Sequence, residues 1–199
     1  MKKSIFVLLF IFSISISFAQ TFRAGGLFGF NATQIDGDDL NGFSRFGFNG
    51  GFFADLPLKK KWSASMEILY SQKGCKSAFA LGNPVNYTLR LNYAEVPFLL
   101  NYHDKEKINF GLGVSFNRLV SQKVLDGNGP VGLQVARYTT IKKNDYDFLF
   151  NGNYVINEHW IFNIRYAYSI FPFATWVNSN FRNRGQYNNV VTVRMGFIF

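Results

Sequence analysis

The last ten residues of the chain, VVTVRMGFIF (190–199), decide the fold. One set of alternate positions in this stretch is wholly apolar: Val191, Val193, Met195, Phe197 and Phe199. The other set is mixed and includes Thr192, Arg194 and Gly196. Because successive side chains of a β-strand point to opposite faces, the stretch predicts a strand with one apolar face and an aromatic ring at its end.

The same period of two recurs along the whole chain, whereas helical periodicity is hard to find. We expect eight strands, near residues 21–33, 44–56, 61–74, 87–102, 107–121, 142–156, 159–172 and 188–199. The chain has 199 residues, which suits one domain. Aromatic residues make up 19% of it, and 24 residues are Phe. This composition excludes a disordered chain.

The connections between the expected strands alternate in length. Those after the second, fourth and sixth strands are tight and polar, with the sequences PLKK, HDKEK and NEH. The other connections are longer and richer in Gly, Asn, Asp and Pro. In an up-and-down arrangement all the long connections share one end, as in outer-membrane barrels. The pattern predicts an all-β fold, an eight-stranded antiparallel up-and-down transmembrane β-barrel in the outer membrane, with both mature termini on the periplasmic side.

The residues on the two faces separate a membrane barrel from a soluble exported barrel, which is the alternative. One face of the strands is dominated by Gly, Ser, Asn and Ala, which suit the inside of a narrow barrel. The other face carries large apolar and aromatic side chains that can face lipid. Rings near the strand ends are expected to form two girdles: Trp62, Trp160 and Tyr102 at the turns, and Tyr70, Tyr87 and Tyr146 at the loops.

The fourth expected strand departs from simple alternation. Leu89, Leu91 and Tyr93 have one parity, whereas the apolar residues from Ala94 to Tyr102 have the other. If apolar side chains always face lipid, the parity switches between Asn92 and Ala94. A β-bulge would reconcile the two halves of the strand.

Residues 1–19 have the features of a cleaved secretory signal peptide: Lys2 and Lys3, an apolar stretch and a small-residue cleavage site. The barrel domain is then 20–199. The whole chain has a formal net charge of +9, and an exported basic chain meets anionic lipid rather than nucleic acid. The single cysteine, Cys75, excludes an internal disulfide and is expected to be a lone surface thiol.

Several segments resemble one known family: EILYSQKG (67–74), NYAEVPFLL (92–100), FGLGVSF (110–116) and the terminal RMGFIF (194–199). The chain resembles the PorT-like outer-membrane β-barrel family of Bacteroidetes along essentially its whole mature length. The resemblance implies insertion by the barrel-assembly machinery, with the terminal ring of Phe199 as part of the assembly signal. The family's namesake is tied to type IX secretion, which gives the chain a possible accessory role in secretion or gliding.

Strand parity places six charged residues inside the expected barrel: Arg23, Glu67, Glu95, Asp147, Arg165 and Arg194. Because an unpaired buried charge is costly, we expect these acids and arginines to form hydrogen-bonded ion pairs. Such a cluster is either a structural plug or a gated path for protons or ions.

No constellation of residues predicts an enzyme, a cofactor or a metal. The only histidines, His103 and His159, fall at the short turns, away from the outer leaflet where a barrel enzyme needs its general base. The acidic run DGDD (36–39) departs from a calcium loop, because Leu40 occupies a ligand position and Gly47 stands where a Glu is required.

The long loops carry basic residues that could pair with lipopolysaccharide phosphates or serve solubility alone: Lys123, Arg137, Lys142, Lys143, Arg182 and Arg184. The leading hypothesis is a non-enzymatic structural or interaction protein that uses its loops or periplasmic turns. Its partners would be outer-membrane lipid and lipopolysaccharide. A secretion-system accessory subunit and a narrow channel are the alternatives.

Overall fold

The computed structural model describes residues 22–38, 42–76, 88–126, 129–131, 138–178 and 181–199. The expected signal peptide (1–19) and Tyr87 of the expected girdle lie outside these ranges. In the part of the chain that is described, no helix is long and apolar enough to cross a membrane.

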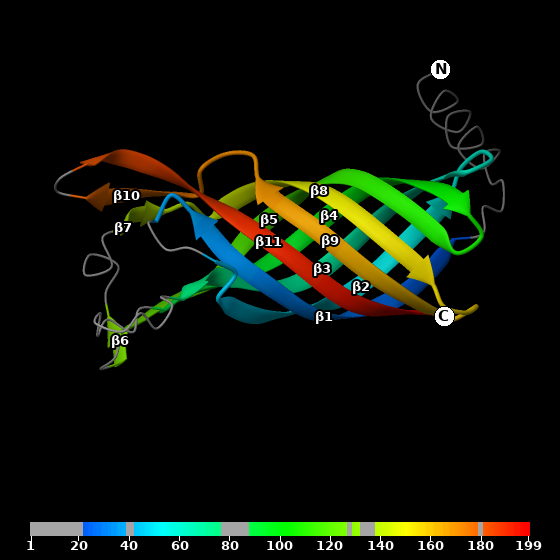
Figure 1. Cartoon of the computed structure of the whole chain (residues 1–199), viewed down its shortest axis with the longest axis horizontal. Coiled ribbons are helices and arrows are strands. Elements are labelled where there is room, and N and C mark those ends of the chain that lie inside the picture. Colours follow the sequence, from blue (N-terminus) through cyan, green and yellow to red (C-terminus); the bar gives the residue numbers. More distant parts are fainter. Residues whose placement is uncertain (1–21, 39–41, 77–87, 127–128, 132–137, 179–180) are drawn as a thin grey trace, which may run out of the picture.

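Eight long strands form one closed antiparallel barrel (Figure 1), as the sequence predicts. They are β1 (Arg23–Asp36), β2 (Arg45–Pro57), β3 (Trp62–Lys76), β4 (Thr88–Lys105), β5 (Ile108–Asp126), β8 (Asn144–Val155), β9 (Trp160–Ser169) and β11 (Phe181–Ile198). Each pairs with the next in this order, and β11 pairs with β1 from Gly25 opposite Ile198 to Asp36 opposite Tyr187. The barrel therefore leaves no open edge among these strands.

Three short strands extend the barrel where the sequence predicts only irregular loops. They are β6 (Gly129–Val131), β7 (Tyr138–Ile141) and β10 (Ala174–Asn178). β10 forms a hairpin with the first part of β11 and pairs with β7 on its other side, while β6 pairs with β5. We call this end of the barrel the loop end (Figure 1). The opposite end, which holds the three tight turns and Phe199, is the turn end.

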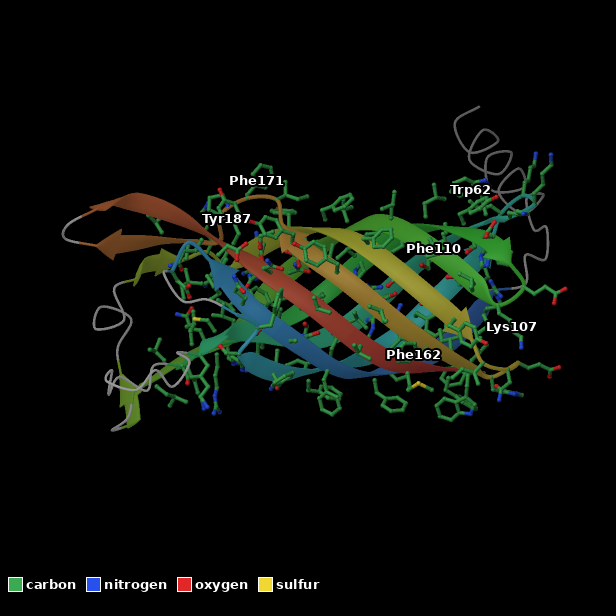
Figure 2. All side chains as sticks on the ribbon, viewed as in Figure 1. Trp62, Lys107, Phe110, Phe162, Phe171 and Tyr187 are labelled. Carbon is green, nitrogen blue, oxygen red and sulfur yellow. The ribbon has the colours of Figure 1, made fainter. Side chains whose placement is uncertain are left out.

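Side chains along the barrel wall alternate as the sequence predicts. Exposed rings such as Phe46, Phe52 and Phe150 point outward, whereas Asn31 and Asn117 are fully buried inside. Figure 2 shows side chains projecting along the whole outer wall, with Trp62 near the turn end and Phe171 nearer the loop end. The outward apolar stretch of β3 runs from Trp62 to Tyr70, close to the roughly 9–11 residues that a tilted membrane-spanning strand needs.

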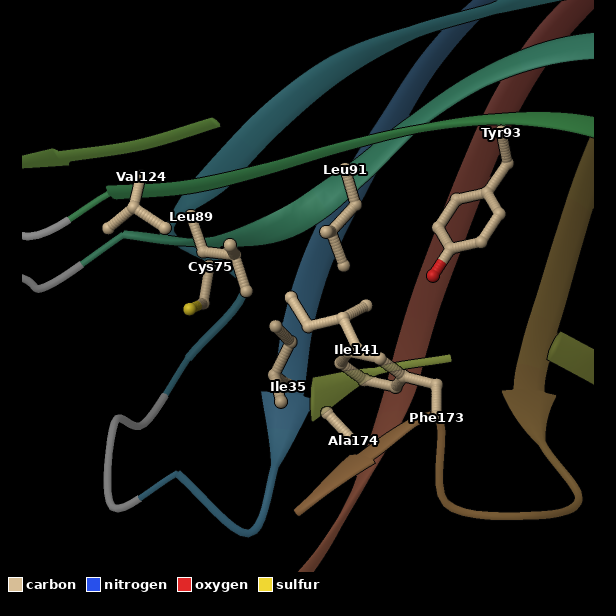
Figure 3. Close-up of a cluster of buried hydrophobic side chains, with 9 residues drawn as sticks. All are labelled: Ile35, Cys75, Leu89, Leu91, Tyr93, Val124, Ile141, Phe173 and Ala174. Carbon is tan, nitrogen blue, oxygen red and sulfur yellow. The ribbon is translucent and has the colours of Figure 1, made fainter. Parts of the chain in front are cut away.

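The alternation of polarity inverts at the loop end, where apolar side chains point inward. They form a buried cluster, the apolar plug, made of Ile35, Cys75, Leu89, Leu91, Tyr93, Val124, Ile141, Phe173 and Ala174 (Figure 3). Above the lipid both the outside and the end of the barrel meet water, so apolar groups are most stable in its interior. Cys75 belongs to this plug and is 3% exposed, so the expectation of a surface thiol is wrong.

The expectation that the fourth strand switches parity is also wrong. β4 keeps one parity throughout, and Leu89, Leu91 and Tyr93 point inward with Glu95. A register shift does occur opposite Asn92 and Tyr93, but the extra residue belongs to β5, because these two residues pair with Ser121 and Leu119. Val120 is the inserted residue and is 62% exposed. The bulge turns Val124 into the plug and Lys123 outward.

Candidate functional site

The middle of the lumen holds a buried ion-pair cluster that joins three strands. Arg165 of β9 donates to both carboxylate oxygens of Glu67 of β3, at 2.9 and 2.6 Å. Arg194 of β11 donates to Glu67 Oε2 at 3.3 Å. All three side chains are almost fully buried, so the carboxylate crosslinks opposite walls of the barrel through charge-assisted hydrogen bonds.

Amide side chains accept further hydrogen bonds from the two guanidinium groups. Arg194 donates from Nε and Nη2 to Asn163 Oδ1, at 2.8 and 2.7 Å, and from Nη1 to Asn49 Oδ1 at 3.1 Å. Arg165 Nε donates to Asn151 Oδ1 at 3.0 Å. Gly29 lies beside this layer, and a Cβ on it would stand 2.6 Å from the Cα of Arg194. Small inward residues therefore leave the space that the arginines fill.

A second ion-pair cluster lies nearer the loop end and is centred on Lys73 of β3. Its ammonium group lies 2.7 Å from Glu95 of β4 and 2.6 Å from Asp147 of β8. Asp145 accepts hydrogen bonds from Ser169 and Asn188, at 2.9 and 2.8 Å. The cluster spans the interior directly beneath the apolar plug, since Lys73 lies 5.2 Å from the ring of Tyr93.

The six charged residues predicted to share the lumen thus separate into three places. Glu67, Arg165 and Arg194 come together, and Glu95 and Asp147 meet at Lys73. Arg23 joins neither cluster: it pairs with Asp55 at 2.6 Å at the turn end, and its side chain is 45% exposed. Arg23 begins β1, so its side chain stands at the mouth of the barrel.

Sequence reasoning missed four charged residues of the strand interior: Arg45, Asp55, Lys73 and Asp145. Each lies within an expected strand and has the parity of its inward neighbours, so carrying the alternation two positions past Ser71 finds Lys73. Arg45 is buried at the loop end and donates to the carbonyl oxygen of Lys73. Asp145 has inward parity as well, and its side chain is buried beside Asp147.

The lumen at the turn end is an open pocket of about 240 Å³ that is lined by both polar and apolar side chains. Its inner end is formed by Glu67 and Arg194, and its mouth by Arg23, His103 and Glu158. Six asparagines line its walls: Asn101, Asn109, Asn151, Asn153, Asn157 and Asn163. The lumen is therefore accessible from the turn end only as far as the central ion pairs.

The outer wall at the loop end carries a group of exposed cations, which we call the basic rim. It consists of Lys76, Arg90, Arg118, Lys123, Lys142 and Lys143. Of the basic residues predicted there, Lys123, Lys142 and Lys143 are exposed and belong to it. Arg137 lies outside the described residues, and Arg182 and Arg184 lie on the loop-end part of β11. Arg90 and Arg118 were missed because they fall within strands rather than loops, and Lys76 was missed although it lies in a long connection.

The remaining candidate residues lie at the turn end. His103 shares a hydrogen bond of 2.9 Å with Ser63 Oγ, and His159 stacks on Phe197. Among the described residues, no three His, Cys, Asp or Glu side chains are grouped so that they could hold a metal ion. Phe199 is exposed, and its amide donates to the carbonyl oxygen of Ala24 at 3.0 Å.

A family model and one solved structure agree with this geometry. A family model described as "Outer membrane protein beta-barrel domain" matches residues 18–174. The attachment invasion locus protein Ail of Yersinia pestis has a similar structure, with a TM-score of 0.51, 9% identity, and coverage of 89% of this chain and 98% of Ail. For OprG from Pseudomonas aeruginosa the TM-score is 0.45 and the identity 14%, over 89% of this chain and 94% of OprG.

At these identities the structural likeness concerns the fold alone. No curated protein matches the chain. The family model, however, covers most of the sequence, and the closed barrel with rings on its outer wall is the structure that such a family requires. The chain belongs to the outer membrane protein β-barrel domain family and is an outer-membrane protein.

Proposed function

We propose that this protein is a non-enzymatic interaction protein of the outer membrane whose basic rim binds lipopolysaccharide phosphates. The observation that carries the proposal is a pair of like charges. Arg90 of β4 stands directly opposite Lys123 of β5, and both side chains are exposed on the outer wall. Like charges directly opposite on one face of a sheet destabilise it, unless an anion lies between them.

The surroundings of this pair support an external anion. The next outward residues, Asn92 and Ser121, are uncharged and bond each other at 2.7 Å. On β5, Arg118 is the next residue after Phe116 whose side chain points outward. The cations therefore begin where the lipid-facing rings end, which is the depth of lipid phosphate groups.

The proposal requires the loop end to face outward, with both mature termini on the periplasmic side. Long loops outside and short turns inside are the usual arrangement of such barrels, which supports this orientation.

The exposed ring of Phe199 at the end of the closing strand supports a further role in recognition by the barrel-assembly machinery. Exchange of Phe199 for Ala should then lower the amount of folded barrel in membranes, and equal amounts would refute that role.

Lipopolysaccharide binding to the purified barrel tests the proposed function. The wild-type barrel, folded in a non-ionic detergent, should retain purified lipopolysaccharide at low salt and lose it as salt rises, because exposed charges are screened. The double variant Arg90→Glu/Lys123→Glu should bind at least about tenfold more weakly, since each basic residue near an anionic surface contributes about 1 kcal/mol.

The matched control is Lys59→Glu/Lys107→Glu, which makes the same charge change among exposed lysines of the turn end. This control should bind like the wild type. Equal binding of lipopolysaccharide by all three proteins would refute the proposal. An equal loss of binding in both variants would show that lipopolysaccharide responds only to the net charge of the protein and not to the basic rim.

The accessory role in type IX secretion rests on the resemblance to the PorT-like family of Bacteroidetes alone. No contact among the described residues favours it. Purification of the tagged protein from native membranes separates the two ideas, because an accessory subunit brings secretion proteins with it in fixed ratio.

A further inference from the structure

We propose that the turn-end pocket is a binding site for a small saccharide of one or two rings. The pocket measures about 240 Å³, which is below the roughly 300–1,000 Å³ of sites for drug-sized ligands. Its inner end is closed by the Glu67–Arg194 ion pair, so a ligand enters from the turn end and stops at that layer. The site is independent of the basic rim, which lies on the outer wall at the other end.

The chemistry of the walls selects a neutral ligand rich in hydroxyl groups. Asparagine amides offer donors and acceptors without net charge, and a sugar hydroxyl can satisfy both. The charges deep in the pocket are already paired, Asp55 with Arg23 and Glu67 with two arginines, while the exposed Glu158 stands at the mouth. An anion or a cation would have to break one of these pairs, which is costly inside the lumen.

One polar atom of the wall has no partner among the described residues. Asn101 is 6% exposed, and its Nδ2 donates to Ser65 Oγ at 2.9 Å, but its Oδ1 accepts no hydrogen bond. A buried acceptor without a partner is unfavourable by about 1–3 kcal/mol. Gly111 makes room for this oxygen, since a Cβ there would lie 2.2 Å from it. A turn of the Asn101 amide toward the pocket would let a ligand hydroxyl satisfy this oxygen.

The pocket also has an apolar side. Phe53 of β2 points inward opposite Glu67 and lines the pocket with Leu27 and Ile161. A partly exposed ring beside amide groups suits a sugar, whose C–H face packs on the ring while its hydroxyl groups reach the amides. This combination distinguishes a saccharide from a simple polar solute, which would gain nothing from the ring.

Nuclear magnetic resonance titration of the full barrel tests the proposal. The isotope-labelled protein is folded in a detergent without a sugar headgroup and titrated with maltose and with N,N′-diacetylchitobiose. At least one of them should cause saturable shifts in the side-chain amide signals of Asn101 and Asn153, while Asn92 on the outer wall stays unchanged. The pair of probes reports whether the site prefers a plain or an acetamido sugar.

Two variants check the site. Asn101→Leu and Phe53→Leu should each weaken saccharide binding about tenfold, which corresponds to roughly 1.4 kcal/mol, whereas Asn92→Leu should bind as the wild type does. No saturable shift with either saccharide would overturn the proposal, and so would equal affinity of the Asn101 variant. The proposal would also be overturned if inorganic phosphate or a tetrapeptide bound more tightly than either saccharide. If a variant fails to fold, the wild-type titration still decides.

Discussion

Glu67 is the residue on which the centre of the lumen depends. Its carboxylate pairs with Arg165 and Arg194, and all three side chains are buried. Removal of one partner of a buried ion pair is destabilising by about 3–5 kcal/mol, because the charges left behind are uncompensated. Glu67→Ala should therefore lower the stability of the detergent-folded barrel by about this amount, as measured by its loss of compact mobility on heating or in urea. Glu158→Ala, an exposed turn-end change, should melt like the wild type.

A substitution of Lys73, also on β3, tests the second ion-pair cluster in the same way. Lys73→Met removes the cation between Glu95 and Asp147, so the acids that remain repel one another. We expect a lower unfolding temperature in the same assay. Lys76→Met, three residues further along the strand at an exposed position, is the matched control. Equal unfolding temperatures for the two variants would contradict the pairing of Lys73 inside the lumen.

Cys75 tests the apolar plug. Its thiol belongs to β3 and is buried in the plug near Leu89 and Val124 (Figure 3). A maleimide should therefore label the folded barrel slowly and the denatured chain fast. An exposed position nearby gives the comparison: a cysteine introduced by Lys123→Cys in a Cys75→Ser background should be labelled fast in the folded barrel. Fast labelling of Cys75 in the folded protein would show that the plug is open.

At the scale of elements, the bulge in β5 decides which face each loop-end side chain takes. Val120 is the extra residue, and the pairs on both sides of it are regular. Deletion of Val120 should leave the barrel folded, since it restores an uninterrupted ladder. Deletion of Val114, in the regular part of β5, should prevent folding because it sends every later side chain of the strand to the wrong face. A folded Val114 deletion, or an unfolded Val120 deletion, would contradict this register.

The eight strands were predictable from sequence because lipid outside and a narrow polar lumen impose a period of two. That reasoning failed for Leu89, Leu91 and Tyr93, where the strand has left the lipid and the apolar groups turn inward. The strands β6, β7 and β10 were not predictable either. The pairing of β7 with β10 joins segments far apart in the chain, and short strands in Gly- and Asn-rich loops carry little periodicity even where they pair locally, as β6 does with β5 and β10 with β11.

The same limit applies to the candidate site. The sequence could assign Glu67, Arg165 and Arg194 to the interior from parity alone, but not which charges pair. Pairing depends on how far each strand is shifted along its neighbours, and that shift places Lys73 beside Asp147 and Arg23 at the mouth. The outward cations Arg90 and Arg118 could be found only once the loop-end limit of the lipid-facing rings was known.

The whole molecule is a barrel whose interior changes along its axis. The turn-end pocket is open, the two ion-pair clusters cross the middle, and the apolar plug fills the loop end. Among the described residues, water and ions entering from the turn end meet paired charges and then the apolar plug, so we expect no continuous path for ions. The outer wall, the loop end and the turn-end pocket are therefore the places where we propose that this protein makes its interactions.

Single-channel recording tests this central claim most directly. The purified barrel, inserted into a planar lipid bilayer under moderate salt, should produce no steps of conductance above the detergent background. A variant that opens both barriers, Glu67→Ala with Phe173→Ala, serves as the positive comparison if it remains folded. Steady conductance steps from the wild-type barrel would contradict the closed lumen and favour the alternative that this protein is a narrow channel.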